Sequence, residues 1–286
     1  MKKNFLREIC IILVSFKSSE KVKKTIKNLN KDISIILVEN SMDISLKIEL
    51  ESKYKNIKVI IPKTNDGQGG AFNLAAKKTN KKYLLFLDMD IKITTTQILK
   101  LIKKAIEIKN FGVITPKIKQ QNYDELKIEK NKNQGLYKVS FNTGCVMLVK
   151  KSTIKKINYF DKKIFLYFEE SDFYMRCIKA NLPVFMYDKV LISNPITYSI
   201  DKKFSHEYLK IRSWHYCWSK FYYYKKHYSY LTGIRKTLPN LIKALKKLFT
   251  HLFKFRFKEM SYFFAEISGL ITSYLNIKSF YRIKIK

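Results

Sequence analysis

The chain has 286 residues, 46% of them hydrophobic and 14% aromatic, so it can bury a sizeable core and does not have the composition of a disordered protein. Its 57 Lys+Arg against 23 Asp+Glu give a net charge of +34. Only six of the basic residues are Arg, the residue whose planar fork reads bases and grips phosphates. The charge by itself therefore does not indicate nucleic-acid binding, and it can equally reflect genome composition.

The cysteines and the hydropathy pattern bear on where the protein is located. Cys10, Cys145, Cys177 and Cys217 form no CxxC pair and lack metal-finger spacing, so we expect reduced cytosolic thiols, no structural disulfide and no zinc. The apolar run 9–14 is too short for a signal peptide, and no stretch approaches the ~18–20 apolar residues of a membrane-spanning helix. We therefore expect a cytoplasmic protein, in solution or peripheral on the inner face of the membrane.

Short apolar runs alternate with helical patterns through the first two hundred residues. The runs predicted to be strands buried on both faces are 9–14, 33–38, 59–61 and 83–87. Helical spacing follows the first, third and fourth of them, the last of these helices around residues 98–105. This alternation predicts an α/β fold with a mainly parallel central sheet flanked by helices.

The pattern changes in the middle of the chain. Residues 119–135 are polar and aperiodic, which indicates a surface insertion. The runs 146–149, 165–168 and 184–192 then predict a mixed extension of the sheet. We therefore assign residues 1–201 to a single domain.

Residues 202–286 form a second predicted region, a basic and aromatic helical appendage. This region carries +16 of the net charge and about half of the aromatic residues. Helical periodicity covers 208–226 and 238–257, with Pro239 expected in the first turn of the second helix. Lysines beside an apolar stripe favour attachment to an anionic membrane surface, although the same stripe could pack on the domain formed by residues 1–201 or on a second subunit.

Polar clusters follow three of the predicted strands, where ligands bind in open α/β sheets. They are Ser15-Phe16-Lys17, Glu39-Asn40-Ser41 and Asp88-Met89-Asp90. Two carboxylates one residue apart at a strand end can reach a single hard cation, so Asp88 and Asp90 predict a site for Mg²⁺ or Mn²⁺ that leaves positions for diphosphate oxygens. A solvated turn is the alternative for such a pair.

Two further segments carry candidate site residues. The glycine-rich turn 65–70 follows the third strand rather than the first, which disfavours a nicotinamide or flavin site and favours either tight packing or backbone close to a nucleotide, with Asn65 placing an amide there. Glu169, Glu170 and Asp172 stand at the start of a predicted helix, where acids can complement the helix dipole or supply a general base.

In this order, these pieces resemble the inverting family-2 glycosyltransferases of the GT-A fold, over roughly residues 8–195. The resemblance is strongest to the branch with rhamnosyl- and galactofuranosyltransferases. Besides the three polar clusters, it rests on the segments 65–73, 142–149, 160–161 and 165–172.

The resemblance implies a function and roles for individual residues. A sugar would pass from a nucleotide-diphosphate sugar to a hydroxyl of a glycan or lipid-linked acceptor, with inversion, in cell-surface polysaccharide synthesis. The residues implied to bind the nucleotide sugar are Ser15, Lys17, Glu39, Asn65, Gly69 and Asp88. Those implied at the acceptor are Glu169, Asp172 and Gly144, with Glu170 as the base. Asp88 and Asp90 would hold Mg²⁺ or Mn²⁺.

The chain departs from the family pattern at three positions. Glu stands at 39 and 170, where the family usually has Asp. Where members often carry a metal-binding His, this chain has Ser193-Asn194-Pro195, so Asn194 is implied only as a weak metal ligand.

Two other functions compete with this one. A basic nucleic-acid-binding protein would explain the charge and the aromatic tail but not the acids at 88–90 and 169–172, so we expect no nucleic-acid partner. A nucleotidyltransferase or another sugar-nucleotide enzyme would share the metal, but usually has a glycine-rich phosphate loop after the first strand. Homo-oligomerisation is left open by the sequence.

Overall fold

The computed structural model describes residues 2–108, 110–121, 129–130, 135–194 and 205–282, and they form two compact units. The sheet unit comprises Met1–Asp66, Gly70–Phe160 and Phe173–Ser199. The helical unit comprises Gly67–Gly69, Asp161–Asp172 and Ile200–Lys286. The boundary predicted between residues 201 and 202 lies outside the described residues.

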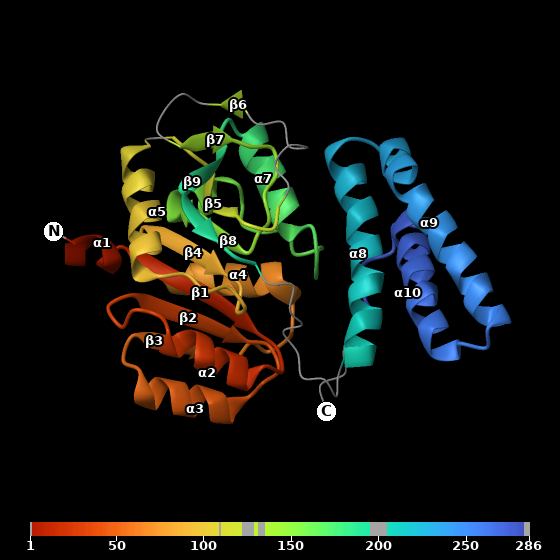
Figure 1. Ribbon diagram of the computed structural model, residues 1–286, viewed down its shortest axis with the longest axis horizontal. Helices are drawn as coiled ribbons and strands as arrows, with labels where there is room; N and C mark the ends of the chain where they lie inside the picture. Colours follow the sequence, from red (N-terminus) through yellow and green to blue (C-terminus); the bar gives the residue numbers. More distant parts are fainter. Residues whose placement is uncertain (1, 109, 122–128, 131–134, 195–204, 283–286) are drawn as a thin grey trace. The chain divides into compact units, whose positions relative to one another are not determined.

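The sheet unit is built on one sheet in which strand order and direction gather the loops of interest (Figure 1). The order is β3-β2-β1-β4-β8-β5-β9-β7-β6. The strands are β1 (Ile9–Ser15), β2 (Ser34–Glu39), β3 (Ile57–Ile60), β4 (Tyr83–Leu87), β5 (Val113–Ile118), β6 (Glu129–Lys130), β7 (Leu136–Lys138), β8 (Val146–Lys150) and β9 (Val184–Ile192). The half from β3 to β4 is parallel throughout, and β8 runs antiparallel between β4 and β5.

Helices cover both faces of this sheet because the strands are apolar on both faces. In β1, Ile9, Ile11 and Leu13 enter one buried cluster, whereas Cys10 and Ile12 enter the other. The first cluster is completed by α1 (Lys2–Arg7), α2 (Ser19–Lys27), α3 (Ile44–Lys53) and α5 (Thr95–Glu107). The second is completed by α4 (Gly67–Lys78), α6 (Lys151–Lys156) and α7 (Glu169–Lys179).

The predicted α/β fold is confirmed, with corrections in both units. Strands β5, β6 and β7 and helices α1 and α3 were not predicted, and β8 is inserted within the sheet instead of extending it. Residues 165–168 are not a strand. Tyr167 and Phe168 have φ of 64° and 67°, a left-handed backbone that no strand adopts. Their rings lie against Tyr216 of the helical unit, at 5.7 Å between centroids in each case.

The helical unit contains α8 (Ser205–His227), α9 (Tyr230–Phe253) and α10 (Phe257–Tyr274). Helix α8 agrees with the predicted 208–226, but the predicted helix 238–257 has the wrong bounds, and α10 was not predicted. Ser229 caps α9 by accepting a hydrogen bond from the Thr232 N–H, so the helix begins before Pro239 and carries that proline in its interior. Phe255, with φ of 51°, separates α9 from α10.

Close backbone approach holds the three helices together. A side chain at Gly269 of α10 would collide with the Trp214 carbonyl of α8, and one at Gly233 of α9 would collide with the Phe221 ring. Trp214 and Ala265 are almost fully buried where α8 meets α10. Within the described part of the chain, none of the helices combines the length and the hydrophobicity needed to cross a bilayer.

Candidate active site

The carboxyl edge of the sheet collects most of the predicted site residues of the sheet unit. Strands β1, β2 and β4 are parallel to one another. Strand β8 is antiparallel to both β4 and β5, and β5 is parallel to β9, so β9 runs in the same direction as β4. The carboxyl ends of β1, β2, β4 and β9 therefore lie at one edge of the sheet. Ser15, Glu39, Asp88 and Asn194 therefore stand at or just beyond this edge. Gly144 joins them because β8 is antiparallel and begins there.

The loops after β1 and β2 are tied to each other. Lys17 has a left-handed backbone (φ 47°), and its N–H donates to Ser41 Oγ at 2.9 Å. Glu39 is 1% exposed and uses its carboxylate inside the chain, accepting from the Asp43 N–H at 2.8 Å and from the Ser41 N–H at 3.1 Å. Ser15 Oγ is buried and has no hydrogen-bond partner among the described residues. It is thus a polar group that a ligand can satisfy.

The turn 88–90 is held by its backbone, which leaves its two carboxylates half exposed. The Asp88 N–H donates to the Cys145 carbonyl at 2.9 Å, and Thr25 Oγ1 donates to the Met89 carbonyl at 2.7 Å. The Met89 side chain is buried. Burial, and then the negative charges of Asp88 and Asp90, raise the pKa of the Cys145 thiol to about 12, so both carboxylates act on the same buried sulfur.

Asn142 belongs to the segment 142–149 that carries the family resemblance, but its sequence pattern indicated no role for it. It is fully buried, and its amide donates to Thr115 Oγ1 at 2.6 Å and to the Pro116 carbonyl at 3.2 Å. Its own Oδ1 accepts from the Thr143 N–H at 2.9 Å. Asn142 therefore fixes the segment that leads to Gly144. Asn194 is held by its N–H on Gln120 Oε1 at 2.9 Å.

The helical unit carries the acids at the start of α7. The left-handed pair Tyr167 and Phe168 turns the chain into the helix, and Ser219 Oγ of α8 donates to the Leu166 carbonyl at 2.8 Å. Glu169 is 6% exposed and Glu170 is half-buried. Burial raises the pKa of the Glu170 carboxyl above its ordinary value, which is the direction that suits a general base working near neutral pH.

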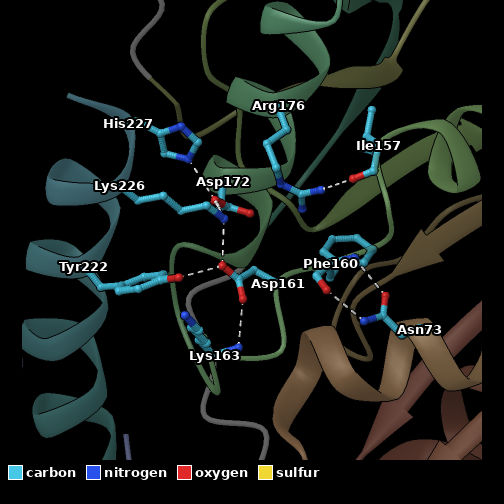
Figure 2. Close-up of polar contacts among 10 residues, drawn as sticks. All are labelled: Asn73, Ile157, Phe160, Asp161, Lys163, Asp172, Arg176, Tyr222, Lys226 and His227. Carbon is cyan, nitrogen blue, oxygen red and sulfur yellow. Dashed lines mark hydrogen bonds and ion pairs between the residues drawn. The ribbon is translucent and has the colours of Figure 1, made fainter. Parts of the chain in front are cut away.

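Asp172 is the centre of an ion-pair network (Figure 2). Its fully buried carboxylate lies 2.5 Å from Lys226 Nζ and 2.8 Å from His227 Nε2, at the end of α8. The same Lys226 nitrogen lies 2.7 Å from Asp161 Oδ2, which also accepts from the Tyr222 hydroxyl at 2.9 Å. Burial raises the pKa of Asp161, but the bonds from Lys226 and its other donors outweigh this and bring it below its ordinary value. The network fastens residues 161–172 to α8.

The glycine turn that opens α4 is anchored in the helical unit. Gly67 has φ of 78°, and a side chain there would collide with the Phe165 carbonyl, which also accepts from the Gln68 N–H at 3.2 Å. Gly69 is buried in the first turn of α4, and Asn65, just before it in the sheet unit, is half exposed. The close-packing interpretation of the turn is therefore supported at Gly67.

The model of the family described as "Glycosyl transferase family 2" matches residues 10–177, more than half of the chain. The chain belongs to glycosyl transferase family 2. The matched residues include every site segment described above from β1 to the first turns of α7. No curated protein matches the chain.

Solved glycosyltransferases share the fold of this family-2 member. The mannosyltransferase PcManGT from Pyrobaculum calidifontis, in complex with GDP-Man and Mn²⁺, superposes with a TM-score of 0.59 at 10% identity, over 94% of this chain and 87% of that one. GalNAc-T7 with UDP, GalNAc and Mn²⁺ gives 0.54 at 10% identity, over 82% and 58%. S. aureus TarS 1-349 gives 0.53 at 14% identity, over 96% and 93%. The fold is therefore of the GT-A type, with a C-terminal helical region.

A divalent cation fits the donors that this glycosyltransferase presents at residues 88–90. Asp88 and Asp90 supply hard carboxylate oxygens from one turn, both carboxylates are half exposed, and the negative charge of each raises the pKa of the Cys145 thiol. Two ligands of this kind suit Mg²⁺ or Mn²⁺ that takes its other oxygens from a diphosphate. Among the described residues, no group of three or more His, Cys, Asp or Glu side chains converges on one point.

Proposed function

We propose that the protein is an inverting glycosyltransferase that moves a sugar from a nucleotide-diphosphate sugar to a hydroxyl of a glycan or lipid-linked acceptor. The observation that carries the proposal is the paired carboxylate turn at the carboxyl edge of the sheet in a family-2 chain. The raised pKa of Glu170 supports a base in the same matched segment.

The donor site proposed is the carboxyl edge of the sheet unit. Ser15, Lys17 and Glu39 border it, and the orphan hydroxyl of Ser15 supports a polar ligand there. Asn65, Gly69 and Asp88 stay predictions for nucleotide-sugar contact. That PcManGT was solved with GDP-Man and GalNAc-T7 with UDP supports a nucleotide-linked donor but leaves the nucleobase and the sugar open.

Asp88 and Asp90 would hold Mg²⁺ or Mn²⁺, with Asn194 as a weak further ligand. The cation, when bound, offsets the negative charge that accumulates on the departing nucleoside diphosphate. Mn²⁺ in the structures of PcManGT and GalNAc-T7 supports the choice of ion.

Glu170 acts as the base in a single displacement. Its carboxylate takes the proton of the acceptor hydroxyl, and the acceptor oxygen bonds to the anomeric carbon from the face opposite the diphosphate. The bond from that carbon to the diphosphate oxygen breaks, and its electron pair leaves with the nucleoside diphosphate. Glu169, Asp172 and Gly144 are proposed at the acceptor. A rhamnosyl or galactofuranosyl donor, and a role in cell-surface polysaccharide synthesis on the inner face of the membrane, complete the proposal.

The test is thermal stabilisation by nucleoside diphosphates with and without Mn²⁺. The full-length chain should gain stability from at least one diphosphate only when the cation is present, and Asp90→Ala should abolish that gain. Asp32→Ala, the same change at an exposed aspartate, is the matched control. An unchanged gain in Asp90→Ala, or stabilisation by nucleic acid alone, would contradict the proposal.

A further inference from the structure

A groove of about 510 Å³ opens in the helical unit, lined by α8, the end of α9, α10 and the segment that follows α10. Its volume lies in the ~300–1,000 Å³ range of small-molecule sites. It is formed by residues that none of the roles proposed above uses.

The groove has a buried floor and exposed aromatic walls. Trp214 and Ala265, on the floor, are 2% and 6% exposed. Phe257, Phe264 and Phe280 line it with 63%, 66% and 60% of their surface open to water. Three phenyl rings around one hollow form an apolar surface that a ligand would remove from water.

The surroundings of this groove are strongly basic. Lys210 lines the groove, and so does Phe257, the first residue of α10. Phe257 belongs to the turn 253–258 between α9 and α10, whose residues are all exposed. In this turn three phenylalanines alternate with three cations: Phe253, Lys254, Phe255, Arg256, Phe257 and Lys258. No acid occurs between residues 208 and 258. Glu207 and Glu259 flank this stretch, and the charge of Glu207 acts on the groove-lining Tyr281, but the cations around the hollow outnumber these two acids. An apolar hollow with a net positive rim is complementary to a molecule with a hydrocarbon chain and an anionic head.

We propose that this groove binds a hydrocarbon chain of an anionic membrane lipid, whose head lies among Lys210, Arg256 and Lys258. The turn 253–258 then meets the headgroup layer, where exposed aromatic rings and lysines are both favoured. This goes beyond the proposed sugar transfer and does not depend on which sugar is moved. The proposal assigns membrane binding to one defined lipid site, in addition to a general attraction between the basic helical unit and an anionic surface.

The two tryptophans of the chain allow a direct test. Trp214 lines the groove. Trp218 lies one turn further along α8 in the same buried cluster but does not line the groove, and it is stacked on Tyr222 and donates to the Ile277 carbonyl at 3.0 Å. Trp218→Phe leaves Trp214 as the only indole. Its emission should be quenched by phosphatidylglycerol vesicles whose acyl chains carry bromine, and not by equally brominated phosphatidylcholine. Trp214→Phe, which leaves Trp218 outside the groove, should show clearly weaker quenching than Trp218→Phe.

A matched pair of charge substitutions keeps the proposal falsifiable if a tryptophan variant fails to fold. Phe264→Asp in the groove should weaken binding to phosphatidylglycerol vesicles at least about ten-fold. Leu231→Asp, on α9 at 77% exposure and outside the groove, should leave it unchanged. Equal effects of the two substitutions, or vesicle binding without quenching of Trp214, would overturn the proposal. So would self-association of the chain that Phe264→Asp abolishes in the absence of lipid, because a second copy would then cover the groove.

Stabilisation by nucleoside diphosphate and Mn²⁺ is measured on the same variants. If Phe264→Asp keeps that response and loses vesicle binding, the lipid site and the transfer site are separate, as proposed. If quenching persists in a chain that responds to no nucleoside diphosphate, the proposed transfer function fails while the lipid site stands.

Discussion

Acidic side chains within one short segment differ in whether a cation reaches them. Asp161 and Asp172 share the ammonium of Lys226, and Asp172 also meets His227. For Glu170, burial dominates, and its pKa rises above the ordinary value of 4.5. Of the four carboxylates in residues 161–172, Asp161 and Asp172 thus anchor the chain, whereas Glu170 can exchange a proton.

We expect Glu170→Gln to lower transfer by about 10²–10⁴-fold while donor binding is retained, because the amide cannot accept the acceptor proton. In the wild-type enzyme, the base works only when ionised, and its pKa is raised. The acidic limb of the kcat/KM profile should therefore have its midpoint above 4.5. A pH series of initial rates measures both effects.

The control for this residue is Glu266→Gln on α10, where burial also raises the pKa of a carboxyl. This variant should keep normal rates and an unchanged pH profile. If Glu170→Gln is active and Asp172→Asn is inactive, the base has been assigned to the wrong acid.

Lys226→Ala should destabilise the protein by roughly 3 kcal/mol, the lower end for breaking a buried ion pair, because it leaves the fully buried Asp172 and the partly buried Asp161 without their shared cation. Asp161 has a lowered folded-state pKa, so its contribution is present above the unfolded value of about 3.9 and is lost as the pH falls through the folded value. The stability difference between wild type and variant should therefore shrink between pH 7 and pH ~3.

Urea unfolding at each pH measures this difference, and Lys246→Ala, at an exposed lysine of α9, is the control. The control should change stability by less than about 0.5 kcal/mol at every pH. Equal stability of the two variants would mean that the network contributes nothing.

At the site, sequence patterns identified acids but not their partners. The spacing of Asp88 and Asp90 after an apolar strand indicated a shared turn because both facts are local. Asp172 and His227 are 55 residues apart, and no local pattern joins them. The hydrogen bonds that occupy Glu39 depend on how the 39–43 loop folds back, which its sequence alone does not specify.

At the scale of elements, prolines and caps explain where sequence and structure differ. Strand β5 contains Pro116, a residue that argues against a strand, and the structure accommodates it by a register shift between Pro116 and Lys117. Pro239 argued for a helix start at residue 238, but α9 begins at Tyr230, after the Ser229 cap and eight residues earlier. Strands β1, β2 and β4 were predictable because burial on both faces leaves a continuous apolar signal, whereas β3 is four residues long and exposes Lys58.

Gly269→Ala should destabilise the helical unit by about 1–3 kcal/mol, although alanine favours a helix by about 1 kcal/mol over glycine. The added methyl would collide with the Trp214 carbonyl, so α8 and α10 must separate. Thermal unfolding measures the change. Thr250→Ala, exposed on α9, adds helix propensity without a collision and should be neutral or slightly stabilising. A stabilised Gly269→Ala protein would contradict this packing.

At the scale of the whole molecule, the reactivity of the cysteines measures how readily each of the two units opens. All four are buried and free, three of them in the sheet unit and Cys217 in the helical unit. Burial is the main cause that raises the pKa of Cys10 to about 11 and the pKa values of Cys145, Cys177 and Cys217 to about 12.

Alkylation by iodoacetamide at pH 8 should therefore modify no cysteine of the folded chain in the time that modifies all four in guanidinium chloride. A thiol with a pKa of 12 is only about 10⁻⁴ ionised at pH 8, and the buried sulfur must also be exposed before it reacts. Intact mass counts the modified thiols, and peptide mapping across a guanidinium series gives each unit its own midpoint. If Cys217 reacts at a lower concentration than Cys10, Cys145 and Cys177, the helical unit opens before the sheet unit. Fast labelling of any cysteine in a chain with native circular dichroism would show that its surroundings open without unfolding and would contradict the burial described.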